Sequence, residues 1–133
     1  MIYFDTAALV KILRRERESD ALTDWMGERD GVLLVTSTLT EVELPRALRR
    51  VEPEVLPEVP ALLQRFARHE IDDSVRRAAA GFPDPVLRSL DAIHLATATV
   101  LADRGLTAFV TYDQRLLAAA VAESLPVASP GAA

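Results

Sequence analysis

The chain has 133 residues, half of them hydrophobic, and a formal net charge of −5 at neutral pH. This length and hydrophobic content suit one folded domain with its own core, and no apolar run is long enough to span a membrane. The apolar start lacks the basic leader of a signal peptide, so we expect a cytoplasmic protein. The chain has no cysteine and two histidines, which excludes disulfides and thiolate metal sites but leaves oxygen-bound cations as candidates. The net charge argues against a simple basic surface for nucleic acid, although bound cations would neutralise part of it.

The beginning of the chain combines a buried strand with an acid. Residues 1–5 form a short apolar run that stops on Asp5, and Thr6 opens an amphipathic stretch that ends at Leu13. This pattern predicts a strand with Asp5 at its carboxyl end, followed by a helix. Ligands bind at the carboxyl ends of strands in open parallel sheets, so Asp5 is a candidate site residue. The simpler interpretation is that Asp5 only caps the helix, because Asp is a favoured N-cap.

The rest of the chain alternates between predicted strands and helices. We predict strands at 32–36, 70–72, 108–111 and 126–128, and helices at 19–26, from 37 or 38 to about 51 with Pro45 as a kink, and at 61–68, 73–80, 90–103 and 115–124. Residues 52–60 are predicted to be a proline-containing loop. The alternation indicates a single α/β domain of the doubly wound type, with a central parallel sheet flanked by helices, over residues 1–130. We expect residues 131–133 to be a disordered tail.

Four acids occupy comparable positions in these elements. Asp5 ends the first strand, Glu43 lies in the helix after the second strand, Asp91 lies in the first turn of a helix, and Asp113 follows the strand at 108–111. In a parallel sheet these positions converge at one edge. Four carboxylates close together disfavour one another's ionisation, and a divalent cation such as Mg²⁺ or Mn²⁺ relieves that repulsion and can activate water for phosphodiester cleavage. Taken singly, Asp91 could simply favour a helix N-terminus, and Asp113 could cap the last helix.

Four blocks of the sequence contain these acids: Met1–Lys11, Thr36–Leu44, Arg88–Ala98 and Val110–Leu116. Together they resemble the PIN-domain family, and most of all the VapC-type toxins of bacterial toxin–antitoxin pairs, and they follow one another in the family's order. The resemblance implies an endoribonuclease that depends on Mg²⁺ or Mn²⁺, built on a parallel sheet flanked by helices. It also implies a cognate VapB-like antitoxin, an RNA substrate and a homodimer within the toxin–antitoxin complex. The apolar surface near residues 51–63 is a candidate contact for either protein partner.

By the same resemblance, the family's acidic quartet corresponds to Asp5, Glu43, Asp91 and Asp113, with Thr111 as the hydroxyl residue before the last acid. Asp5 and Asp91 would be the surest metal ligands. Glu43 and Asp113 would complete the metal site and orient the attacking water. All five residues are therefore predicted to be catalytic.

The helix with Glu43 also carries Glu41, and the two must be distinguished. Residues two apart on a helix point about 200° away from each other, so only one of them can face the site. A helical wheel places Glu43 on the inner side and Glu41 at the outer margin. Arg46 and Arg50 share the stripe of Glu43, so we expect them, together with Thr6, to contact the RNA substrate.

One further residue near the quartet has two possible roles. His94 follows Asp91 by nearly one helical turn. We favour a buried structural histidine over a catalytic one, because metal-dependent phosphodiester cleavage does not require a histidine.

Other classes of protein fit the sequence less well. A phosphotransferase of the haloacid-dehalogenase type needs a second Asp two residues after the first, and Ala7 stands there. A receiver domain needs a lysine at a later strand end, and the only lysine is Lys11. A non-catalytic PIN-like scaffold would be expected to lose some of the acids. The remaining alternative is a PIN-domain nuclease of RNA processing outside a toxin–antitoxin pair, which the identity of the upstream gene would distinguish.

Overall fold

The central strand β1 (Ile2–Phe4) lies between two parallel neighbours, β2 (Leu34–Ser37) and β4 (Ala108–Val110). The computed structural model describes residues 1–132 and continues the sheet with β3 (Ala67–His69) beside β2 and β5 (Val127–Ala128) beside β4. The strand order is therefore β3-β2-β1-β4-β5, with every pair parallel. The chain extends the sheet first to one side of β1 and then to the other, which confirms the doubly wound α/β fold.

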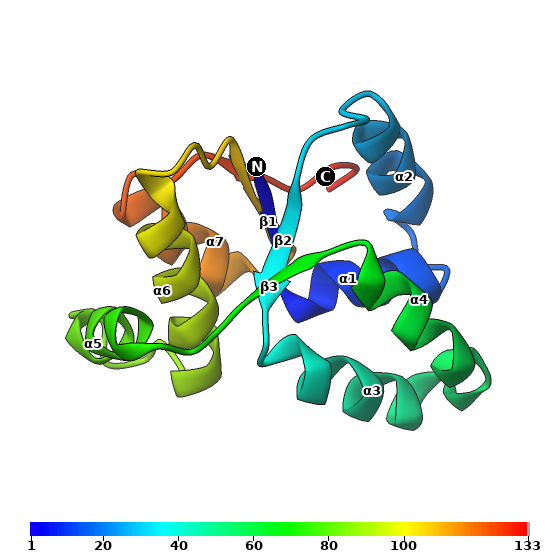
Figure 1. The fold of residues 1–133 in the computed structure, drawn as a ribbon, viewed down its shortest axis with the longest axis horizontal. Coiled ribbons are helices and arrows are strands. Elements are labelled where there is room, and N and C mark those ends of the chain that lie inside the picture. Colours follow the sequence, from blue (N-terminus) through cyan, green and yellow to red (C-terminus); the bar gives the residue numbers. More distant parts are fainter. Residues whose placement is uncertain (133) are drawn as a thin grey trace.

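Helices connect the strands and cover both faces of the sheet (Figure 1). In the described part of the chain they are α1 (Thr6–Leu13), α2 (Ser19–Gly27), α3 (Thr40–Val51), the 3₁₀-helix η1 (Pro53–Glu58), α4 (Val59–Gln64), α5 (Asp73–Gly81), α6 (Ser89–Ala102) and α7 (Gln114–Ala122). Figure 1 shows α1, α3 and α4 on one side of the sheet and α5, α6 and α7 on the other. None of the helices within residues 1–132 is long and apolar enough to cross a membrane.

The side chains of β1 alternate between two hydrophobic cores. Ile2 and Phe4 belong to the core that α1, α3 and α4 cover. Tyr3 belongs to the core under α6 and α7, where its ring stacks on Phe109 at 5.5 Å between ring centroids. Because all three β1 side chains are almost fully buried, β1 is fixed from both faces, and the chain that leaves its carboxyl end is held with it.

The segment between α3 and β3 differs from the sequence prediction. The predicted loop at 52–60 is helical over most of its length, because the prolines preset a backbone angle that suits the starts of η1 and α4. The predicted helix at 61–68 ends at Gln64, and the predicted edge strand at 70–72 lies three residues earlier, at 67–69. Phe66 explains the shift, since it packs edge-on against Phe4 in the core and thereby brings the next residues beside β2.

The large apolar residues of this segment lie mainly in the core, whereas they were expected at the surface. Val59, Leu62 and Leu63 are buried in the core, so they do not form an exposed contact surface. Val51, Pro53, Pro57, Pro60 and Ala61 are exposed there, and Val55 and Leu56 are half-buried. The exposed apolar surface over residues 51–63 is therefore narrower than expected, and its contact with a protein partner stays a prediction.

The helix that carries Glu43 is continuous through Pro45, and it begins at Thr40 rather than at residue 37 or 38. Leu44 and Leu48 are both fully buried on its inner side. The helical register is thus the same on both sides of the proline. At the other end of the chain, the prediction of a disordered tail extends to Ala133, which lies outside the described residues.

Candidate active site

The four predicted acids line one cleft at the carboxyl ends of β1 and β4. Asp5 directly follows β1, and Glu43 lies in α3. Asp91 lies in the first turn of α6, and Asp113 directly precedes α7. The cleft has a volume of about 920 Å³. The elements on both sides of the sheet therefore contribute to it, as expected where the direction of winding changes.

Asp5 has two roles in the structure. Its Oδ1 accepts a hydrogen bond from the backbone N–H of Ala8 at 2.9 Å, so Asp5 does cap α1. Its Oδ2 accepts a hydrogen bond from the hydroxyl of Thr111 at 2.6 Å. Asp5 is only 4% exposed, and burial raises the pKa of its carboxyl, with a smaller increase from Asp91 and opposing effects from His94 and Thr111. Asp5 therefore caps α1 and also lies in the cleft, so both interpretations are correct.

Thr111 and Asp113 connect the end of β4 to the same site. The hydroxyl oxygen of Thr111 also accepts a hydrogen bond from the backbone N–H of Asp113, at 3.2 Å. Asp113 in turn caps α7, because its Oδ1 accepts from the backbone N–H groups of Arg115 and Leu116 at 2.9 Å each. Thr111 therefore fixes the positions of two of the acids relative to each other.

Glu43 is held by two donors inside the cleft. Its Oε1 accepts from the hydroxyl of Thr6 at 2.6 Å and from Nε2 of His94 at 2.8 Å. Burial alone would raise the pKa of Glu43, but the hydrogen bonds from His94 and Thr6 outweigh burial and bring that pKa below its ordinary value. Glu41 instead lies on the exposed side of α3, where it pairs with Arg68 of β3 at 2.9 Å. The helical wheel therefore assigned the two glutamates to the correct sides.

His94 is more closely connected to the acids than the sequence indicated. It is 2% exposed, and its Nδ1 lies 2.6 Å from the hydroxyl of Tyr3 while its Nε2 contacts Glu43. Because an ionised carboxylate only accepts hydrogen bonds, the proton of this contact is on Nε2. In the neutral imidazole Nδ1 is then an acceptor, and Tyr3 donates to it. The spacing of three residues between Asp91 and His94 was the only signal in the sequence that His94 shares the face of α6 that lines the site.

Asp91 differs from the other three acids because it accepts no hydrogen bond from any residue between 1 and 132. Burial raises the pKa of its carboxyl, and the neighbouring charges of Asp113 and Glu43 raise it further, against the lowering effects of His94 and Arg88. Such mutual repulsion is what a bound cation relieves, and carboxylate oxygens suit Mg²⁺ or Mn²⁺. Within residues 1–132, no three carboxylate or histidine side chains lie close enough to hold an ion by themselves. The donor set fits Mg²⁺, which in proteins commonly has one or two carboxylate ligands and completes its coordination with water and substrate phosphate.

Basic residues line the rim of the cleft. Arg46 and Arg50 of α3 are exposed there and form no ion pair with any residue in the described part of the chain. Lys11 also lines the cleft, but it pairs with Glu18 at 2.9 Å and lies over the ring of Tyr112. Thr6, predicted to contact substrate, is buried and directs its hydroxyl to Glu43. The free positive charge on this wall is therefore that of the two arginines.

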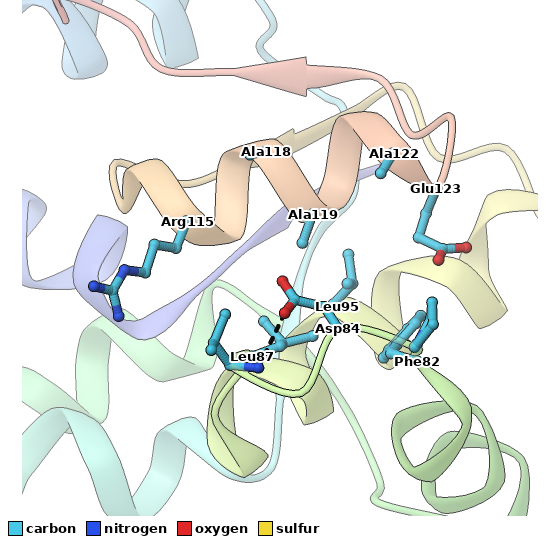
Figure 2. A pocket seen from close by; sticks show the side chains of 11 residues that line it. Phe82, Asp84, Leu87, Leu95, Arg115, Ala118, Ala119, Ala122 and Glu123 are labelled. Atoms are coloured by element: carbon cyan, nitrogen blue, oxygen red, sulfur yellow. Dashed lines mark hydrogen bonds between the residues drawn. The ribbon is translucent and has the colours of Figure 1, made fainter.

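A second groove lies between α7 and the segment at 82–87 and has a different character (Figure 2). Its volume is about 450 Å³, and its walls are mainly apolar, with Phe82, Leu87 and Ala119 among the lining residues. Within residues 1–132, Asp84 and Glu123 are the only carboxylates that line it, and Asp84 accepts a hydrogen bond from the backbone N–H of Val86. It brings together no group of acids comparable to that of the cleft.

Comparison with known proteins agrees with this geometry. The PIN-domain family profile matches residues 2–122 of the chain. The chain is 58% identical over 134 aligned positions to Ribonuclease VapC35 of Mycobacterium tuberculosis, and the match covers 100% of this chain and 99% of that protein. Two solved structures share the fold: FitAcB from Neisseria gonorrhoeae, with a TM-score of 0.72, 19% identity and 98% coverage of both chains, and a toxin–antitoxin complex from Klebsiella pneumoniae, with a TM-score of 0.71, 21% identity and 98% coverage of both chains. The chain therefore belongs to the PIN-domain family and, within that family, to the VapC proteins.

Proposed function

We propose that this chain is a divalent-metal-dependent endoribonuclease and the toxin of a VapBC-type toxin–antitoxin pair. The observation that carries the proposal is the full-length identity of 58% to a protein named as a ribonuclease. The cleft lined by Asp5, Glu43, Asp91 and Asp113 supports it independently, because the acids have the oxygen donors and the mutual repulsion that such chemistry needs.

The proposed metal is Mg²⁺ or Mn²⁺, which when bound supplies a Lewis acid that polarises the phosphate and lowers the pKa of water. Asp5 and Asp91 are the proposed ligands from the chain, with Glu43 and Asp113 completing the site. Asp91 is the most available of the four, since no residue in the described range donates a hydrogen bond to it.

The residues around the acids set their orientation and protonation. Thr111 holds one oxygen of Asp5, and Thr6 and His94 hold one oxygen of Glu43. The donors to Glu43 keep it ionised, so it can accept a hydrogen bond or a proton from the attacking water. Arg46 and Arg50 bind phosphates of the RNA at the wall of the cleft.

The proposed protein partners are a VapB-like antitoxin and a second copy of the chain. The likeness to a solved structure described as a toxin–antitoxin complex supports the first of these. A ribonuclease toxin harms the cell that makes it unless it is inhibited, and an antitoxin arginine reaching the carboxylates would be a suitable contact. We expect the pair to act in the cytoplasm.

Cleavage mapping on total RNA tests the proposal. Purified protein should cut single-stranded RNA internally when Mg²⁺ or Mn²⁺ is present and should stop when a chelator is added. The matched variant Asp91→Asn should not cut, and the product of the adjacent upstream gene should inhibit the wild-type protein. Undiminished cleavage in excess chelator, or by Asp91→Asn, would contradict the mechanism.

A further inference from the structure

A second hollow continues from the acidic cleft between the beginnings of α6 and α7. It has a volume of about 500 Å³ and shares Arg88, Asp91 and Asp113 with the cleft. It extends the lining to Gln114 and Arg115, which lie beyond Asp113 on α7. The acids are therefore not at the closed end of a cleft but in the middle of a longer groove.

Each end of this groove carries two arginines. Arg46 and Arg50 lie at the α3 end, and Arg88 and Arg115 lie at the α6–α7 end. All four are exposed, and none forms an ion pair with another residue between 1 and 132. In a protein with a net charge of −5, two pairs of exposed arginines on either side of an acidic centre, none of them in an ion pair within residues 1–132, are a specific arrangement. It matches a ligand that carries negative charge along its whole length and passes over a cation-binding centre.

We propose that Arg88 and Arg115 bind RNA phosphates on the side of the scissile bond opposite to Arg46 and Arg50, so that one single strand crosses the acidic centre from end to end. This inference rests on the proposed function. It adds to the proposed endoribonuclease the residues that hold the strand on the second side of the cut, because cleavage inside a strand leaves phosphates on both sides of the scissile bond.

The apolar groove beside α7 indicates where the phosphate path ends. It meets the second hollow at Val86, Leu87 and Arg115. Figure 2 shows the guanidinium of Arg115 extending away from the alanines of α7 that line this groove. Beyond Arg115 the charged side chains of the groove are the carboxylates of Asp84 and Glu123, which repel phosphate. Arg115 is therefore the last basic residue on the path.

Binding of labelled RNA tests the inference without relying on cleavage. In an Asp5→Asn background that keeps the RNA intact, a 5′-labelled 12-nucleotide single strand is titrated in Mg²⁺ at several salt concentrations and followed by fluorescence anisotropy. Arg88→Gln and Arg115→Gln should each lower affinity about fivefold near 0.1 M salt and reduce the slope of log K against log salt by about 0.7. In the double variant the two losses of affinity and the two reductions of the slope should add. Arg77→Gln and Arg104→Gln are the matched controls, because these arginines are exposed, line neither hollow, and form no ion pair within residues 1–132.

The outcomes separate the inference from the function on which it rests. If the background protein binds RNA and the double variant binds it with an unchanged salt slope, the inference is wrong while the function stands. Equal losses in the control variants would also overturn it, since they would show a general effect of net charge. If the wild-type protein cuts no RNA and the background protein does not bind it, the proposed function fails and the inference fails with it.

Discussion

Nε2 of His94 lies 2.8 Å from Oε1 of Glu43, and Nδ1 of the same ring lies 2.6 Å from the hydroxyl of Tyr3. The imidazole thus joins the buried centre of β1 to an acid of the cleft. Burial raises the pKa of Tyr3 well above its usual value, with smaller increases from Asp5 and Glu43, so its hydroxyl stays protonated and donates to Nδ1. That donation fixes the tautomer in which Nε2 donates to Glu43.

Two substitutions at His94 should distinguish the effect of its hydrogen bond to Glu43 from the effect of the space that its side chain fills. The amide nitrogen of Gln can occupy the place of Nε2, whereas that of Asn is closer to the place of Nδ1. We therefore expect His94→Gln to keep most of the ribonuclease activity and His94→Asn to lose about 10- to 100-fold in kcat, because a hydrogen bond to a charged group contributes about 1.5–3 kcal/mol. The measurements are kcat and KM at equal folded concentration. Equal activity of the two variants would show that His94 only fills space.

The wild-type protein provides a spectroscopic check on the same point. In ¹⁵N spectra of the histidine rings, His94 should show the tautomer protonated at Nε2, and Tyr3→Phe should weaken that preference. The Phe ring keeps the stacking against Phe109, so the fold should remain. A ring of His94 protonated only at Nδ1 in the wild-type protein would contradict the assigned direction of the hydrogen bonds.

The two glutamates of α3 give a second matched pair. Glu43→Gln should abolish cleavage and growth inhibition, because the amide cannot replace the carboxylate as a base or as an anionic ligand. Glu41→Gln should retain most of both, since the exposed ion pair with Arg68 that it removes is worth at most about 1 kcal/mol. Activity is compared in RNA cleavage and in growth assays. The reverse order of activities would show that the inner side of α3 has been misassigned.

Thr111 offers a test of how Asp5 is held. Thr111→Val has nearly the same shape but cannot donate to Oδ2 of Asp5, which should leave a buried carboxylate with one donor fewer and raise its pKa further. We expect a loss of stability of about 1–3 kcal/mol and a loss of activity. Thr111→Ser keeps the hydroxyl and should recover most of the activity. Denaturant unfolding and cleavage rates measure the two effects, and the prediction fails if Val and Ser behave alike.

Asp91 should influence stability in a direction that depends on pH. Its pKa is raised in the folded state, chiefly by burial and by Asp113, so the folded protein binds more protons than the unfolded chain between the two pKa values. Stability should therefore decrease as pH rises from the usual range of an aspartate through the raised pKa of Asp91. Metal-free Asp91→Asn should lose this part of the pH dependence and melt at a higher temperature than the wild type at neutral pH.

A bound divalent cation should reverse the order of the melting temperatures of the wild type and Asp91→Asn. Mg²⁺ or Mn²⁺ binds the folded state and should raise the melting temperature of the wild type. It should have much less effect on Asp91→Asn. Thermal unfolding with and without chelator measures both differences. A wild type that is more stable than Asp91→Asn in excess chelator at neutral pH would contradict the proposed repulsion among the acids.

The sequence predicted the parts of the site that depend on local pattern. Apolar runs located β1 and β4, and with them Asp5 and Asp113, because a buried strand is continuous in apolar character. The helical wheel distinguished Glu43 from Glu41 because the register of α3 is continuous through Pro45. From the sequence, Asp5 and Asp113 could each be either a helix cap or a site residue. A carboxylate has two oxygens, so one oxygen can cap the helix while the other faces the site.

The features that were missed depend on contacts far apart in the chain. The position of β3 follows from Phe66 packing on Phe4, which no local propensity encodes. The contact of His94 with Glu43 joins residues 51 positions apart, and its contact with Tyr3 joins residues 91 positions apart. Spacing along a helix can place His94 on a face, but only the tertiary structure determines its partners.

The hydrogen bond from Thr111 to Asp5 spans 106 residues of the chain. During synthesis, β1 can pair with β2 early, but its other edge stays open until β4 has left the ribosome. Contacts of such long range form late in folding, because much of the chain must be ordered before they are made. Asp91 and Asp113 also join the site only at this late stage. A chain that has folded only as far as β3 therefore has two of the four acids, Asp5 and Glu43, and lacks the hydrogen bond from Thr111 that holds Asp5.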